Sequence, residues 1–197
     1  MAIEPIIETT AIQFSSVGTY PITLTGGSDD NYDVFLQSDS LIVLPKQLSI
    51  ISEDKTKIYG ESDPTLTVNY TGFVDGEDAT DLSGTLSISR ALGEAVNTYA
   101  ITASGLTSTN YLINYVDGVF TITNKSMTST EITTATIADL VYTGQAQTPI
   151  LQVEDGATIL TQDTDYELSY VNNTNVGTAT ITITGKGNYN GTRTVTF

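Results

Sequence analysis

The sequence predicts an all-β chain of tandem small domains, each a β-sandwich or β-grasp-like fold, that together form an elongated rod. Three observations lead to this prediction. Apolar and polar residues alternate in many short runs rich in Thr and Tyr, with no clear helical period. One segment recurs three times at a constant spacing. The joins between the repeats are short and contain no flexible Gly/Ser linker.

The repeated segment reads VGTYPITLTGGSDDNY from Val17, VNTYAITASGLTSTNY from Val96 and VGTATITITGKGNY from Val176. The leading valines are 79 and 80 residues apart, and the closing Asn-Tyr pairs are 79 and 78 apart. In each copy apolar side chains alternate with threonines, which predicts a strand with one buried face that leads into a hairpin. The closing pairs are Asn31-Tyr32, Asn110-Tyr111 and Asn188-Tyr189.

The repeats divide the chain into three predicted domains. Residues 1–46 are the rear half of a first repeat truncated at its N-terminus, residues 47–124 a complete repeat, and residues 125–197 a third, divergent repeat whose final strand is cut short. The chain is therefore expected to be a piece of a longer array. The joins Pro45-Lys46-Gln47 and Asn124-Lys125-Ser126 are short enough to favour a semi-rigid rod over freely hinged domains.

The composition excludes several classes of site. The 197 residues include 7 Lys+Arg and 23 Asp+Glu, for a formal net charge of −16, and no Cys, His or Trp. A zinc site with the usual ligands, a disulfide framework and a Ser-His or Cys-His nucleophile are therefore excluded. The acidic charge repels phosphate backbones, so nucleic acid is not an expected partner. No apolar run reaches the ~20 residues of a membrane span, so no membrane insertion is expected.

The middle repeat resembles a known family. The run KIYGESDPTL from Lys57, followed by SGTLSISRALGEAVNTYAIT from Ser83, is similar to the MBG domain of the YGX type. The first repeat matches only the rear half of that pattern. The third departs further, because Ala179 replaces the strand tyrosine and Tyr142-Thr143-Gly144 carries an extra residue. The resemblance implies mostly-β, extracellular repeats of bacterial cell-surface and adhesin proteins, with no shared catalytic residues.

Acidic residues gather in three predicted loops, where hard oxygen ligands could hold calcium. None fits the EF-hand spacing, and none recurs in register, so we expect solvated loop charge, no cofactor, and calcium only as an alternative. The stretch Asp75–Leu82 is also the one place where a short helical turn is expected, since acidic residues favour a helix N-terminus. The metal candidates are Asp29, Asp30, Asp33, Asp75, Glu77 and Asp78, with Asp81, Asp163, Asp165 and Glu167 in the same loops.

The remaining residues favour neither catalysis nor a sugar-binding platform. A glycosidase needs two carboxylates at a fixed separation in a cleft, and repeats this small leave little chain beyond their own core. Tyrosines recur at matched positions, which favours burial or the anchoring of a turn. No repeat places a lysine, an acid and an asparagine together for a Lys–Asn isopeptide cross-link. The tyrosines are Tyr20, Tyr32, Tyr99, Tyr111 and Tyr189, and the available lysines Lys46, Lys55, Lys57, Lys125 and Lys186.

We therefore expect a non-catalytic structural stalk of a secreted bacterial cell-surface, adhesin-like protein, whose partners are the neighbouring repeats of the same chain. Two alternatives stay open. One is an adhesin module whose inter-strand loops bind a host or matrix glycan or protein, and the other is a set of calcium-rigidified extender domains. Saturable binding that loop substitutions abolish would favour the first. A melting temperature that EDTA lowers would favour the second.

Overall fold

The computed structural model describes residues 2–197 and consists mainly of short strands, which confirms the all-β class. The one helical element among these residues is a 3-10 turn, η1 (Ala79–Asp81), in the acidic stretch where the sequence predicts a helical turn. Asp78 caps η1, because its carboxylate accepts from the Thr80 N–H at 2.7 Å. The Asp81 carboxylate accepts in turn from the Asp78 N–H at 2.8 Å, so the acidic residues satisfy the turn's free backbone donors.

The strands form antiparallel, parallel and mixed sheets. Most pairs are antiparallel, but β4 pairs with β9, β5 with β10 and β11 with β17 in parallel. The sheets have the strand orders β1-β2-β3, β6-β4-β9, β5-β10-β8-β7, β11-β17, β12-β13-β14 and β15-β16-β18. The strand bounds are β1 (Ile3–Thr9), β2 (Gly18–Ser28), β3 (Asp39–Val43), β4 (Lys46–Ser52), β5 (Lys55–Ile58), β6 (Val68–Thr71), β7 (Ser83–Arg90), β8 (Asn97–Thr107), β9 (Tyr111–Val116), β10 (Gly118–Thr123), β11 (Lys125–Ser126), β12 (Ile132–Thr134), β13 (Val153–Asp155), β14 (Thr158–Ile159), β15 (Tyr166–Val171), β16 (Thr180–Gly185), β17 (Tyr189–Asn190) and β18 (Thr192–Thr196).

The chain packs as two compact units, and strand β8 contributes to both. The two units are defined by which residues pack together, whereas the predicted domain boundaries after residues 46 and 124 are defined by the sequence repeat. The two divisions describe different properties, so the predicted boundaries stay a prediction. Unit 1 comprises the chain up to Ser52, Thr67–Ser89 and Thr102–Asp117, and unit 2 comprises Glu53–Leu66, Arg90–Ile101 and Gly118–Phe197.

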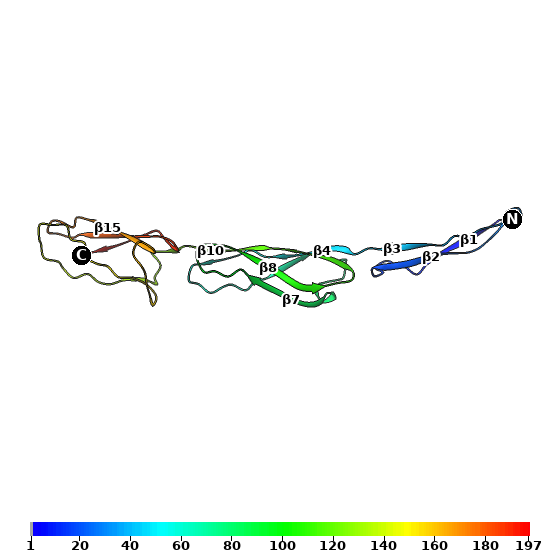
Figure 1. Cartoon of the computed structure of the whole chain (residues 1–197), viewed down its shortest axis with the longest axis horizontal. Helices are drawn as coiled ribbons and strands as arrows, with labels where there is room; N and C mark the ends of the chain where they lie inside the picture. The colour runs from blue at the N-terminus through cyan, green and yellow to red at the C-terminus, as the bar shows by residue number, and fades with distance from the viewer. Residues whose placement is uncertain (1) are drawn as a thin grey trace. The chain divides into compact units, whose positions relative to one another are not determined.

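Unit 1 begins with a sheet that contains no buried residue. Along β1, β2 and β3 (Figure 1) every side chain is exposed or half-buried, and in β2 the two classes largely alternate. Burial begins in β4, where Leu48 and Ile50 are both 0% exposed.

Strands β7 and β8 approach closely at Gly84 and Gly105. A Cβ atom at Gly84, whose φ is +91°, would lie 2.2 Å from the Gly105 carbonyl oxygen, so the approach requires glycine.

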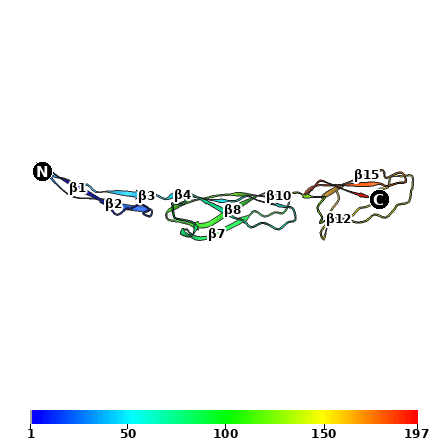
Figure 2. The same ribbon diagram turned by 180° about the vertical axis from the view of Figure 1, so that it is seen from behind.

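Unit 2 contains the hydrophobic core of the third repeat. Its central strand β16 contributes Ile181 and Ile183, which are both fully buried. Between β12 and β13 the chain runs through residues 135–152 without forming a strand (Figure 2), yet Leu151 from this segment is buried in the core. The core cluster comprises Met127, Ile132, Leu151, Val153, Leu160, Tyr166, Ile181, Ile183 and Tyr189.

Candidate joints between repeats

The Asn-Tyr pairs of the second and third repeats lie beside the strand that follows each join. Asn110-Tyr111 leads into β9, which pairs in parallel with β4, so that Lys46 is in register with Tyr111. Asn188-Tyr189 leads into β17, which pairs in parallel with β11, so that Lys125 is in register with Tyr189. We call these contacts joint 1 and joint 2. Joint 1 lies wholly within unit 1, and joint 2 wholly within unit 2.

In joint 1, Asn110 binds two segments that are distant in sequence. Its Oδ1 accepts a hydrogen bond from the Val17 N–H at 3.0 Å, and its backbone carbonyl accepts from the Lys46 N–H at 3.0 Å. Ser108 shapes the turn, because its Oγ accepts from the N–H groups of Asn110 and Tyr111 at 3.1 and 3.2 Å. One asparagine thus fixes both the first residue of the first repeated segment and the first residue of β4.

Joint 2 makes the same two bonds. The Asn188 Oδ1 accepts from the Val96 N–H at 2.8 Å, and the Asn188 carbonyl accepts from the Lys125 N–H at 3.0 Å. A further bond runs from Asn124 Nδ2 to the Gly187 carbonyl at 2.9 Å. Because corresponding positions of the repeat make corresponding bonds twice, the arrangement belongs to the repeat pattern and not to one local sequence.

The tyrosine of each pair is buried within its joint. Tyr111 is 5% exposed and Tyr189 is 4% exposed. The Tyr111 ring meets Phe73 edge-on with centroids 5.4 Å apart, and the Tyr189 ring meets Tyr59 edge-on at 5.5 Å. Edge-to-face pairs of this kind contribute roughly 0.5–1.5 kcal/mol beyond the burial of their area. Each joint therefore combines a hydrogen-bonding asparagine with an aromatic anchor.

Each phenol has polar partners, as buried hydroxyl groups require. The Tyr111 hydroxyl accepts from the Val74 N–H at 2.9 Å and donates to the Glu77 carboxylate. The Tyr189 hydroxyl donates to Asp155 Oδ2 at 3.1 Å. Burial, reinforced by the neighbouring carboxylate, raises the pKa of both phenols above the usual value. Both tyrosines therefore stay protonated, and able to donate, throughout the physiological pH range.

A second pair of tyrosines anchors the other side of the joints. The Tyr20 hydroxyl donates to the Ser16 carbonyl at 2.7 Å, and the Tyr99 hydroxyl donates to the Ala95 carbonyl at 2.8 Å. In both cases the accepting residue comes directly before the valine whose N–H binds the asparagine. These tyrosines therefore hold the valine amide in place. The third repeat has Ala179 at this position and lacks the anchor.

The recurring tyrosines only partly follow the prediction of burial or turn anchoring. Tyr111 and Tyr189 are buried, while Tyr20 and Tyr99 are half-buried and anchor turns. The prediction is wrong for Tyr32, which is 77% exposed. In the second repeat the residues after Asn-Tyr form β9 and pair with β4, whereas residues 33–38 of the first repeat form no strand. Tyr32 therefore has no layer to pack against.

Two lysines are buried, each against two carboxylates. Lys57 Nζ donates to Asp63 Oδ1 at 2.7 Å and to Glu94 Oε2 at 2.5 Å. Lys125 Nζ donates to Asp155 Oδ1 at 2.6 Å and also to the Glu131 carboxylate. Burial opposes the charged ammonium, but the carboxylates outweigh burial and raise the pKa of both lysines. These contacts are ion pairs, and the partners are acids rather than the asparagine of a Lys–Asn cross-link.

Arg90 joins the ion pairs around Lys57. Its Nε donates to Asp63 Oδ2 at 2.5 Å, it also donates to the Glu94 carboxylate, and its guanidinium carbon lies 4.7 Å from the centre of the Phe120 ring. Hydrogen bonds from Arg90 first, and from Lys57 second, lower the pKa of Asp63 to about 2. We call Lys57, Asp63, Arg90 and Glu94 the charge cluster of the middle repeat.

The acidic residues proposed as calcium ligands have other partners in several cases. The Asp29 carboxylate accepts from the Asn31 N–H at 2.8 Å, Asp78 caps η1, and Glu77 accepts from the Tyr111 hydroxyl. Within residues 2–197, no three or more acidic side chains are placed to share a metal ion. Calcium binding by the loops of Asp29, Asp30, Asp33, Asp75, Glu77 and Asp78 remains a hypothesis for solution experiments.

A comparison with protein-family models finds a match in the middle of the chain, a region that contributes residues to both joints. Residues 48–121 match the model of the MBG domain (YGX type). The middle repeat is of the MBG type. This matched segment contains Val96, Asn110 and the whole charge cluster. MBG domains form a family associated with surface proteins and not known as enzymes. No curated protein matches the chain. Among the described residues, no helix has the length and apolar character to cross a membrane.

The sequence draws attention to the Asn-Tyr pairs but not to what the asparagine binds. A hairpin turn suffices to explain an asparagine in that position, so its side chain is not an obvious binding group. The signal that could have revealed the contact is that the valine and the asparagine recur together, at the same positions of each repeat. Val17 and Asn110 are 93 residues apart, and Val96 and Asn188 are 92 apart, which is the spacing of two bonded positions in successive repeats.

Proposed function

We propose that the chain is a non-catalytic spacer of a secreted bacterial cell-surface, adhesin-like protein, in which the joints limit bending between successive repeats. The observation that carries the proposal is the repetition of the same asparagine contact, at Asn110 and at Asn188. A stalk needs each repeat to be held by its neighbour, as in other repeat proteins whose stability is a sum of units and nearest-neighbour interfaces.

The construction of the joints supports a stiff connection. Joint 2 continues the chain from β10 directly into β11 with only Asn124 between them. Strand β11 pairs with β17, and the Tyr189 ring is buried against Tyr59. A flexible Gly/Ser linker would leave the chain free to rotate at this point, whereas paired backbone and a buried ring resist rotation. Bending at the joint would expose Tyr189 and leave the Asn188 amide without its partner.

Measurement of distances across joint 2 tests this proposal. The natural chain has no cysteine, so Thr98→Cys and Thr194→Cys place one spin label in β8 and one in β18, at exposed positions within unit 2. Pulsed electron paramagnetic resonance on the full chain should give a narrow distance distribution. Asn188→Ala should broaden it. Asn31→Ala is the matched control, because Asn31 occupies the same position of the first repeat, outside joint 2, and should leave the width unchanged.

Two results would contradict the spacer function. A distribution that is already broad in the unsubstituted labelled chain would mean that the joint does not limit bending. Saturable binding in a screen of the folded chain against glycans and matrix proteins, lost when loop residues are replaced, would instead identify a binding module. A narrow distribution together with no binding from a folded sample is the result expected of a spacer.

A further inference from the structure

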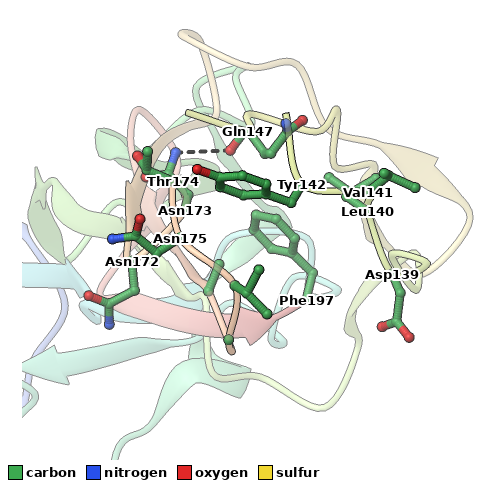
Figure 3. Close-up of a pocket in the computed structure, with 13 residues that line it drawn as sticks. Asp139, Leu140, Val141, Tyr142, Gln147, Asn172, Asn173, Thr174, Asn175 and Phe197 are labelled. Carbon is green, nitrogen blue, oxygen red and sulfur yellow. Dashed lines mark hydrogen bonds between the residues drawn. The ribbon is translucent and has the colours of Figure 1, made fainter. Parts of the chain in front are cut away.

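A cavity in the third repeat lies around Val176, the valine that corresponds to Val17 and Val96. This cavity of about 380 Å³ lies wholly within unit 2 and is lined by residues 139–142, Gln147, residues 172–177, Ala179 and Phe197. Figure 3 shows the Tyr142 and Phe197 rings at the cavity, with the Asn172–Asn175 loop beside them. Asn173 Nδ2 donates to the Gln147 carbonyl at 2.9 Å, and the Gln147 N–H donates to the Asn173 carbonyl at 2.8 Å. The two walls of the cavity are thus tied together.

The cavity carries the accepting half of a joint. Val176 holds the position of Val96, and Tyr142 holds the position of Tyr59 in the repeat. In joint 2, the Val96 N–H donates to an asparagine Oδ1 and the Tyr59 ring meets a buried tyrosine. Val176 is 86% exposed and Tyr142 is 61% exposed, and among residues 2–197 the Val176 N–H has no hydrogen-bond acceptor. A backbone donor and an aromatic ring are therefore presented at the mouth of a cavity.

The first repeat carries the complementary half. Its Asn31-Tyr32 pair is exposed, whereas Asn110 and Asn188 are half-buried and their tyrosines are buried. Tyr32 is 77% exposed and Phe35, three residues further on, is 99% exposed. Both aromatic side chains are therefore accessible to a partner. Among residues 2–197 both halves of the joint are therefore present, and neither is filled in the way that joints 1 and 2 are.

We propose that the cavity at Val176 is a docking site for the Asn-Tyr hairpin of another repeat of this kind, and that the Asn31-Tyr32 hairpin of a second copy of the chain binds there. The asparagine Oδ1 accepts from the Val176 N–H, and the tyrosine ring enters beside Tyr142. Ala179, which replaces the anchoring tyrosine of the other repeats, removes a bulky side chain from this wall. The space at joint 1, by contrast, is only about 100 Å³.

Such a contact joins unlike surfaces of two copies, so it is head-to-tail and gives a ring or an open chain of copies, not a two-fold symmetric dimer. It is also weak, because in joints 1 and 2 the asparagine carbonyl is bound by the following strand, through Lys46 or Lys125, and a second copy does not supply that strand. Within one chain, a short connection provides an effective concentration in the millimolar range, and the separate halves lose this advantage. Half-saturation is therefore expected only when the free chain itself reaches about 1 mM. The net charge of −16 on each copy opposes association, so the measurement uses about 1 M salt to screen it.

Nuclear magnetic resonance titration tests the docking site with full-length chains. The ¹⁵N-labelled chain carries Asn31→Ala, which removes the donor hairpin's asparagine and leaves the cavity intact. The unlabelled chain carries Val176→Pro, which removes the N–H of the cavity and leaves the hairpin intact. As unlabelled chain is added to several millimolar, the amide resonances of Val176 and of residues 172–177 should shift progressively and approach saturation.

The control titrant carries both Asn31→Ala and Val176→Pro and should leave the Val176 resonance where it was. No shift at Val176 with the intact hairpin, or an equal shift with the control titrant, overturns the docking site. Shifts confined to other surfaces overturn it as well. The docking site does not depend on the spacer role: flexible joints in the labelled full chain would refute the spacer while leaving this titration unaffected. Conversely, a negative titration says nothing against stiff joints.

Discussion

Strands β2 and β16 lie in repeated segments that begin with the same Val-Gly-Thr motif, and each is the central strand of a three-stranded antiparallel sheet. Only β16 contains buried residues. Ile181 in β16 is 0% exposed, whereas Ile22, at the same position of β2, is only half-buried. The difference is the rest of the repeat. Residues 127–160 supply Met127, Ile132 and Leu151 to the core over β16, whereas none of residues 2–46 is buried. The alternating pattern therefore specifies the strand, and the front half of the repeat specifies its burial.

The largest effect that tests this comparison is expected from truncation of the matched isoleucines. Ile181→Ala should reduce the free energy of unfolding of the third repeat by about 3–4 kcal/mol, because it leaves a cavity in a packed core. Ile22→Ala should reduce that of the first sheet by less than about 1 kcal/mol, because part of the side chain is already in water and no packed core surrounds it. The repeats need not unfold in one transition. Urea unfolding is therefore followed through the amide resonances of each repeat, which gives a separate free energy of unfolding for each. Equal losses at the two positions would contradict the comparison.

Asn188 and Asn31 occupy the same position of two repeats, but among residues 2–197 only Asn188 bonds to another repeat, so their substitutions extend the comparison to the joints. Asn188→Ala should lower the free energy of unfolding of unit 2 by about 1–2 kcal/mol, because the half-buried Val96 N–H loses its acceptor. Asn31→Ala should change it by less than about 0.5 kcal/mol, since surface substitutions away from special contacts have small effects. The urea midpoint of resonances in unit 2 provides the measurement. A loss from Asn31→Ala as large as that from Asn188→Ala would mean that the asparagine acts within its hairpin and not across the joint.

The charge cluster gives the middle repeat a pH-dependent contribution to stability, and none of its four residues lies in residues 2–46. The pKa of Asp63 is lowered from 3.8 to about 2, chiefly by Arg90. A lowered carboxyl pKa stabilises the folded state above pH ~4, and this contribution is lost as the pH falls towards 2. The Asp63 side chain is 39% exposed, so water screens the gain to less than about 1 kcal/mol.

Asp63→Asn should therefore destabilise the chain at pH 6 and converge with the unsubstituted chain near pH 2. Urea midpoints measured at intervals of pH give the difference directly. Asp39→Asn is the control, because among residues 2–197 the Asp39 carboxylate accepts a hydrogen bond only from the neighbouring Ser40 N–H. A difference for Asp63→Asn that stays constant from pH 6 to pH 2 would show that the loss comes from packing and not from charge.

The sequence predicts the local features of this molecule and fails where partners are distant. Alternation of Ile and Thr specifies β2, β8 and β16, and the acidic stretch before Leu82 correctly indicates η1, because both depend on neighbouring residues. Tyr32 is predicted to behave like Tyr111, but its exposure depends on whether a strand such as β4 lies beside it. The role of Asn110 depends on an amide 93 residues away, which no local pattern specifies.

The smallest effect is expected from calcium, and it distinguishes the acidic loop of the first repeat from that of the second. Extracellular calcium sites bind at about 10⁻⁴–10⁻³ M, so 2 mM calcium would stabilise a real site by up to about 2 kcal/mol. In the second repeat Asp78 already caps η1 and Glu77 already binds Tyr111, so ligation would break contacts that stabilise the fold. We expect the melting temperature to be equal in EDTA and in calcium.

Asp78→Ala should lower the melting temperature equally in EDTA and in calcium, because the cap of η1 is lost with or without metal. A melting temperature lowered by EDTA in the unsubstituted chain, with the difference abolished by Asp78→Ala, would establish calcium at this loop; a difference abolished only by Asp29→Ala would assign it to the first.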